Sequence, residues 1–80
     1  MLKIGFNVVS AEPVPVSVFI HDLAGNTVAR LFDSVVLPAG RFVALWDGRD
    51  HRAKTVEPGW YIVSYRYNDL SVLRTVMWRL

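Results

Sequence analysis

The chain has 80 residues, a formal net charge of +2, no cysteine and an apolar fraction of 52%. This length accommodates one domain, residues 1–80, and so short a chain buries only about 60% of its unfolded surface. Domains of this size gain stability from disulfides, a metal or a partner. Disulfides are excluded, and His21 and His51 have no carboxylates at metal-ligand spacing. We therefore expect no metal and no cofactor, and a protein partner as the stabilising element.

The first part of the chain predicts two strands. Residues 2–9 and 14–22 alternate apolar and polar side chains, which is the pattern of a strand with one buried face. Pro13 and Pro15 lack the backbone N–H that a ladder requires, so the start of the second strand is predicted at a sheet edge. The sequence at 23–26 contains Gly and Asn, which tolerate positive φ, and predicts a tight turn.

Two further strands are predicted before the longest polar stretch. Residues 27–33, with a continuation over 35–37, alternate imperfectly, which indicates a bulge or burial on both faces. Residues 41–46 alternate regularly after a turn at 38–40. Residues 47–59 are then irregular and rich in charged side chains.

The last part of the chain predicts a hairpin. Residues 60–67 and 70–79 both alternate, and the Asn-Asp pair at 68–69 is typical of a two-residue connection. Six or seven short antiparallel strands separated by turns indicate an all-β, immunoglobulin/fibronectin-like β-sandwich.

Three short segments carry a family resemblance. They are LPAGR at 37–41, WDGRD at 46–50 and PGWY at 58–61. In this order and spacing, over residues 4–80, the chain resembles the immunoglobulin-like domain of flagellar hook-capping proteins, a module also found at the C-termini of secreted bacterial proteins. The resemblance implies the sandwich fold and a non-catalytic role in assembly. We assign a structural loop motif to Trp46, Asp47, Gly48, Asp50, Pro58 and Gly59.

The acidic loop around Asp47 and Asp50 allows two interpretations. The carboxylates can accept hydrogen bonds from loop N–H groups and so hold the turn. Alternatively they bind calcium, but this cation takes six or more oxygen ligands and Glu57 is the one obvious further donor. We favour the structural interpretation.

Catalysis and nucleic-acid binding have little support in the sequence. His21 and His51 are not accompanied by a serine in a nucleophile motif or by a glycine-rich phosphate loop, so we expect no enzyme activity. Arg66, Arg74 and Arg79 alternate with aromatic residues, a pattern that can bind single-stranded nucleic acid. We favour an ordinary outer sheet face with arginine stems over aromatic rings, and expect no nucleic-acid partner.

A candidate interface lies on the last hairpin. The alternation and the resemblance both place the tyrosines of 60–67 in the core, which turns Trp60 and Ile62 outward. The same argument on the last strand turns Leu73 and Met77 outward. Trp and Met are enriched in the cores of interfaces, so these four residues predict a protein-binding patch. The alternative is that another segment of the chain covers them.

No signal peptide or membrane span is recognisable. Met1 leads directly into strand-like sequence, and no apolar run approaches the roughly 18 residues of a span. We expect a chain that is cytoplasmic as synthesised, without membrane insertion, and that can enter an exported or extracellular assembly.

The functional hypothesis is a non-catalytic structural subunit that makes protein contacts in a homo-oligomer or a larger bacterial complex. Alternatives are a binding module for carbohydrate or peptide, and the C-terminal domain of a secreted or hook-capping protein.

Overall fold

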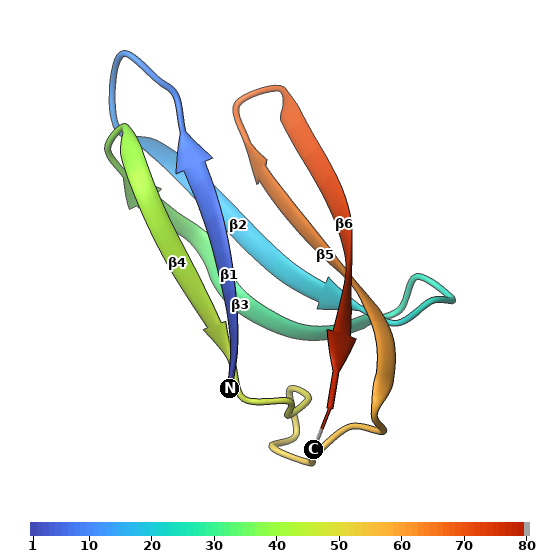
Figure 1. Cartoon of the computed structure of the whole chain (residues 1–80). Helices are drawn as coiled ribbons and strands as arrows, with labels where there is room; N and C mark the ends of the chain where they lie inside the picture. The colour runs from blue at the N-terminus through green and yellow to red at the C-terminus, as the bar shows by residue number, and fades with distance from the viewer. Residues whose placement is uncertain (80) are drawn as a thin grey trace.

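Six antiparallel strands form two sheets in the computed structural model, which describes residues 1–79 (Figure 1). In chain order they are β1 (Leu2–Val8), β2 (Val14–His21), β3 (Thr27–Leu37), β4 (Gly40–Trp46), β5 (Gly59–Tyr67) and β6 (Leu70–Trp78). Strands β1 and β4 form a two-stranded sheet, and the other sheet has the order β3-β2-β5-β6. The all-β antiparallel sandwich expected from the sequence is confirmed. Residues 1–79 contain no helix of the length and hydrophobicity needed to cross a membrane.

The hydrophobic core lies between the two sheets and follows the alternation of the strands. On β2, Val16, Val18 and Ile20 have no exposed surface, as their predicted common face requires. Phe6 of β1 reaches the other sheet, and its ring centre lies 5.6 Å from that of Phe32 on β3. Apolar side chains removed from water in this way each stabilise the fold by about 1.5–3 kcal/mol.

The predicted faces of β4 and β5 are also confirmed. Their inward side chains are buried or half-buried, namely Phe42, Ala44, Trp46, Tyr61, Val63, Tyr65 and Tyr67. The strand boundaries differ from expectation by single residues: β4 and β5 begin one residue earlier, and β1, β2 and β6 end one residue earlier.

Strand β3 contains the bulge that its imperfect alternation predicted. Its pairing with β2 shifts between Val16 and Val18, so that two residues of β3 oppose Ser17. At this point Ser34 has φ 54°, and its N–H donates to the Ser17 hydroxyl over 3.0 Å. Burial on both faces, the other interpretation of the pattern, is wrong because residues 33–36 are exposed.

The proline-rich start of β2 lies where this strand has a single neighbour. Pro15 is paired with Val36 of β3, whereas pairing with β5 begins further on, between Ser17 and Arg66. The missing N–H of Pro15 therefore falls outside the two-sided part of the ladder, and the predicted edge position is confirmed for this end of the strand.

Candidate functional site

The four residues of the predicted patch lie together on the outer face of the β5-β6 hairpin. Trp60 pairs directly with Met77, and Ile62 and Leu73 lie on the same face of the same ladder. Trp60 is 54% exposed and Leu73 is 68% exposed, while Ile62 and Met77 are half-buried. Trp60 and Leu73 are thus not covered by another segment, which was the alternative. We call Trp60, Ile62, Leu73 and Met77 the β5–β6 strip.

A polar row lies beside the strip and was not anticipated from the sequence. His21 Nε2 lies 2.8 Å from Ser64 Oγ, and His21 Nδ1 lies 3.4 Å from Thr27 Oγ1. A shallow hollow surrounds them, lined by Phe19, His21, Thr27, Ser64, Arg66, Ser71 and Leu73. Only the strand pairing brings His21 next to Ser64, since 43 positions separate them in the chain.

Ser64 and His21 are the residue types of two members of a nucleophilic triad, but the orienting carboxylate and the oxyanion donors do not accompany them. The neighbour of His21 Nδ1 is the Thr27 hydroxyl rather than a carboxylate. Ser64 lies within a regular strand, whose N–H groups serve the ladder and do not converge on an oxyanion. The contact provides the partner that the buried Ser64 hydroxyl requires.

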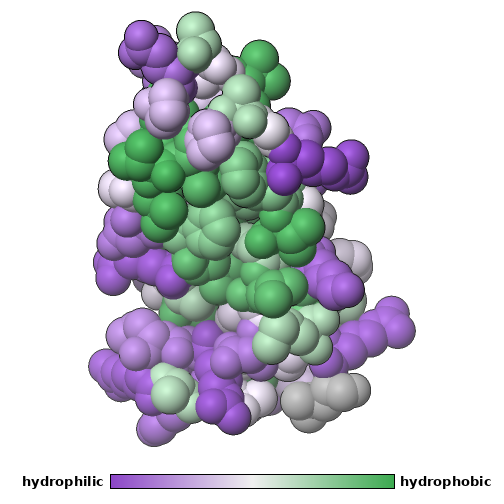
Figure 2. All heavy atoms as spheres, turned by 90° about the vertical axis from the view of Figure 1, so that its left-hand side faces the viewer, coloured by the Kyte–Doolittle hydropathy of each residue, from purple (hydrophilic) through white to green (hydrophobic). Residues whose placement is uncertain are grey.

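A second apolar surface lies on the other side of the molecule. Figure 2 shows a band of hydrophobic side chains between polar groups above and below it. The exposed apolar residues of the two strands on this side are Val35 and Val36 of β3 and Val43 and Leu45 of β4, with exposures of 41%, 62%, 51% and 52%. The register turns Val35 to the same face as Val16 and Val36 to the opposite face. We call these four residues the β3–β4 side. Alternation identified Val43 and Leu45 as outward residues, but their proximity to β3 depends on how the sheets stack.

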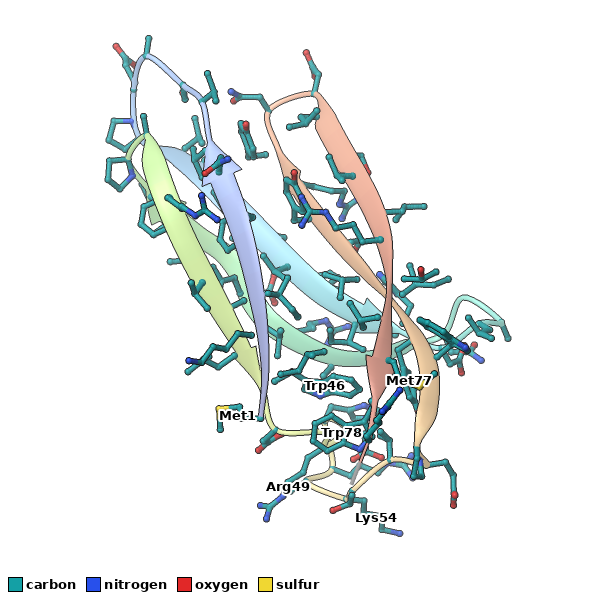
Figure 3. The ribbon with its side chains drawn as sticks, in the orientation of Figure 1. Met1, Trp46, Arg49, Lys54, Met77 and Trp78 are labelled. Carbon is teal, nitrogen blue, oxygen red and sulfur yellow. The ribbon has the colours of Figure 1, made fainter. Side chains whose placement is uncertain are left out.

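The WDGRD segment closes one end of the sandwich. Trp46 and Trp78 lie side by side there, with ring centres 5.3 Å apart (Figure 3). Gly48 packs so closely on the Trp78 ring that a Cβ at this position would overlap it, and the φ of Gly48 is +75°. A side chain at this position is therefore excluded by both space and backbone conformation.

The loop carboxylates bind backbone N–H groups, as the structural interpretation expects. Asp47 accepts from the N–H of Arg49 over 3.0 Å. Asp50 accepts from the N–H groups of Lys54 and Arg52 over 3.1 and 2.8 Å. These bonds, that from Lys54 above all, hold the pKa of Asp50 below its usual value.

The calcium alternative needs a third carboxylate, that of Glu57, beside Asp47 and Asp50. The backbone carbonyl of Glu57 accepts a 2.6 Å hydrogen bond from the Tyr61 hydroxyl at the base of β5. Within residues 1–79 no group of three or more His, Asp or Glu side chains is placed to hold a metal ion. Pro58 is exposed and Gly59 begins β5, so these two residues of the motif mark the return of the chain into the sheet.

The arginines of the last hairpin do not share a face. Arg66 lies on the outer face, opposite Ser71, whereas Arg74 lies on the inner face, opposite Val63. The expectation that both lie on one outer face is wrong, because nine residues of continuous ladder fix their parity. The Arg74 guanidinium stacks over the Tyr65 ring, 5.5 Å from its centre.

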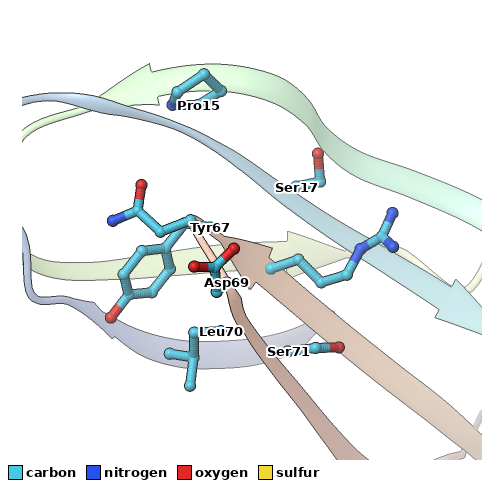
Figure 4. Close-up of a pocket in the computed structure, with 8 residues that line it drawn as sticks. Pro15, Ser17, Tyr67, Asp69, Leu70 and Ser71 are labelled. Carbon is cyan, nitrogen blue, oxygen red and sulfur yellow. The ribbon is translucent and has the colours of Figure 1, made fainter.

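A second hollow lies at the β5-β6 turn (Figure 4). It is lined by Pro15, Ser17, Arg66, Tyr67, Asn68, Asp69, Leu70 and Ser71. Asp69, Leu70 and Ser71 are exposed, so the feature is a surface depression beside a turn. The buried polar group in its lining is the Tyr67 hydroxyl, which already accepts from the Val9 N–H over 3.0 Å.

No protein-family model matches the chain, and comparisons with curated proteins and with solved structures found no match. The class that the structure defines is an all-β domain of six antiparallel strands packed as sheets of two and four strands.

Proposed function

We propose that the chain is a non-catalytic structural subunit that makes protein–protein contacts in a homo-oligomer or a larger bacterial assembly. The observation that carries this proposal is the β5–β6 strip, where Trp60 and Leu73 are each more than half exposed. Single exposed apolar residues are common, but contiguous patches mark interaction sites. Trp and Met are also the residue types enriched in interface cores.

The family resemblance supports the same proposal. The segments LPAGR, WDGRD and PGWY occur in the order found in the immunoglobulin-like domain of hook-capping proteins. Two of the three contribute to the closed end of the sandwich, through Trp46 and Gly48 in one and Tyr61 in the other. The resemblance therefore favours a module that supplies shape and contact surface.

The replacement Trp60→Asp tests the proposal. A central interface tryptophan contributes about 2 kcal/mol or more to binding, which is roughly a thirtyfold change in Kd. We expect Trp60→Asp to weaken association in analytical ultracentrifugation while the fold is retained. Leu23→Asp, at an exposed turn residue outside the strip, is the matched control. A wild-type chain that stays monomeric at high concentration, with solubility unchanged in Trp60→Asp, would contradict the proposal.

A binding module for carbohydrate is the second candidate, and the polar row favours it. Leu73 of the strip borders the hollow that contains Ser64, His21 and Thr27, so an apolar contact lies beside several hydroxyl and imidazole groups. Sugar recognition uses such combinations of apolar stacking and hydrogen bonds. In this case the protein is monomeric and oligosaccharides change the fluorescence of Trp60. The Trp46→Phe variant retains Trp60 and removes one of the other two tryptophans from the signal. If its fluorescence stays unchanged across an oligosaccharide panel, carbohydrate binding is excluded.

A further inference from the structure

The sheet edges of this fold are protected unequally. In the described part of the chain β1, β3, β4 and β6 each have one side without a neighbouring strand. Such a side presents free N–H and C=O groups, a template for pairing with another chain. Bulges, inward-pointing charges and covering loops are the features that prevent this pairing.

Three of the four edges have such protection. On β1, the Gly5 carbonyl accepts a 3.2 Å hydrogen bond from Nη1 of Arg74. The same Arg74 is an inward-pointing charge in the middle of β6. On β3, the bulge at Ser34 interrupts the ladder, and the N–H of His51 in the long loop donates to the Val28 carbonyl over 3.0 Å.

Strand β4 lacks these features within residues 1–79. It pairs with β1 from Gly40 to Trp46 without a register shift. It contains no proline, and its one charged residue, Arg41, lies near its start. Val43 and Leu45 are about half exposed on its outer face. The edge is therefore regular, extended and flanked by apolar side chains.

We propose that β4 pairs antiparallel with β4 of a second copy of this chain across a twofold axis at Ala44. Residues directly opposite in an antiparallel ladder point to the same face of the sheet, whereas neighbours along one strand point to opposite faces. The twofold axis must therefore pass through a residue and cannot pass between two neighbouring residues. With Ala44 at the axis, Val43 faces Leu45 of the second copy. The two-stranded sheet then becomes four-stranded, in the order β1-β4-β4-β1.

Charge complementarity selects this register. Pairing about Ala44 places Arg41 opposite Asp47 of the second copy, and the symmetry repeats the pair. Pairing about Val43 instead places Arg41 opposite the apolar Leu45. Both charged side chains are exposed in the single chain, and Asp47 uses one carboxylate oxygen, Oδ1, for the Arg49 N–H. Opposite charges directly across a ladder stabilise it, and like charges destabilise it.

The apolar character of this side also fits a second copy. Val43 and Leu45 are about half exposed on β4, and Figure 2 shows a hydrophobic band on this side of the molecule with polar groups above and below it. An apolar centre with a polar rim is the usual composition of such contacts.

This inference rests on the proposed function, because it names a second copy as the partner at one surface. It leaves the β5–β6 strip, on the outer face of the other sheet, free for a different contact.

Reciprocal charge exchange tests the register. Arg41→Asp leaves two acidic groups at each pair, and Asp47→Arg leaves two basic groups. We expect the wild-type chain to sediment as a dimer and each variant to associate about tenfold more weakly or worse, since two attractive pairs become repulsive. An equimolar mixture of the variants restores both pairs, so we expect a heterodimer by native mass spectrometry.

Controls separate this result from unfolding and from other surfaces. Arg52→Asp makes the same charge change in the exposed loop and should leave the dimer intact. Asp47→Arg removes the acceptor of the Arg49 N–H, so Val43→Lys, which leaves the loop unchanged, is a second probe of the interface. We expect Val43→Lys to lose the β4–β4 dimer while any association through the β5–β6 strip remains, with an unchanged circular dichroism spectrum.

The inference would be overturned by a monomeric wild-type chain, by variants that dimerise like the wild type, or by a mixture that forms no heterodimer. An assembly lost in Trp60→Asp but kept in Arg41→Asp and Val43→Lys would overturn pairing at β4 while leaving the proposed function intact. Binding of an extended apolar peptide to a monomer, blocked by Val43→Lys, would overturn self-pairing and show that this edge accepts a foreign strand instead.

Discussion

The three tryptophans divide between two regions with opposite character. Trp46 and Trp78 are 1% and 8% exposed and close one end of the sandwich, whereas Trp60 is 54% exposed on the outer face of β5. The first region makes its contacts within the chain: the Trp46 indole N–H donates to the Arg49 carbonyl, and Gly48 packs on Trp78. The second presents apolar surface to its surroundings. The most conspicuous sequence motif therefore serves the fold, and the less conspicuous strip is available for contact.

The sharpest test of this contrast compares two alanine substitutions. Trp46→Ala should lower the free energy of unfolding by about 3–5 kcal/mol, because it leaves a cavity beside Tyr61 and Trp78. Trp60→Ala should change stability by about 0.5 kcal/mol or less, as at other exposed sites. Urea unfolding followed by circular dichroism measures both. Similar losses in the two variants would remove the distinction between the regions.

Gly48 offers a test within the loop itself. Gly48→Ala should cost about 3 kcal/mol, since it combines a residue with positive φ and overpacking against Trp78. Gly25→Ala is the matched control, because Gly25 has φ +92° but a Cβ there would meet no atom within 4 Å beyond its chain neighbours. It should cost about 1–2 kcal/mol, from the backbone alone. Equal losses would show that contact with Trp78 contributes nothing.

Arg74 of β6 contacts the edge of β1. Arg74→Ala removes the hydrogen bond to the Gly5 carbonyl and the stacking on Tyr65. Because Arg74 is exposed, the free energy of unfolding should fall by only about 1 kcal/mol. The substitution also frees the edge of β1, so we expect larger oligomers in light scattering. Arg66→Ala, on the outer face, should do neither. If the oligomer size distribution of Arg74→Ala is the same as that of the wild type, Arg74 does not protect this edge.

The smallest expected effect is the acid dependence of the two turns. Hydrogen bonds from Asn26, from its side chain first, hold the pKa of Asp22 below its usual value, as those from Lys54 and Arg52 do for Asp50. Each carboxylate therefore stabilises the fold above its unfolded pKa of about 4, and this contribution is lost as the pH falls through the lower folded pKa.

The double variant Asp22→Asn/Asp50→Asn isolates this contribution, because asparagine keeps an acceptor oxygen without the titration. We expect the urea midpoint of the wild type to fall more between pH 6 and pH 3 than that of the double variant. Equal slopes would place the acid dependence in other groups.

Local pattern was sufficient for the strands and their faces. The alternation at 14–22 and 60–67 places Val16, Val18 and Tyr61 inside, because successive side chains of a strand point to opposite faces. The positive φ of Gly25 and the irregularity of β3 follow from equally local rules. The four residues of the β5–β6 strip follow from the same parity on a single hairpin, together with the family resemblance that indicated which face of each strand points inward.

The pairing of distant strands could not be predicted from local pattern. Alternation does not reveal that His21 meets Ser64, that Arg74 turns inward to Gly5, or that β4 is left as a regular free edge. Each depends on which strands become neighbours, and that choice is made by the packing of the whole core. The sequence by itself determined the strands, their inward faces and the turns, since these depend on neighbours along the chain; only the tertiary structure decided which edges and surfaces remain open, since these depend on neighbours in space.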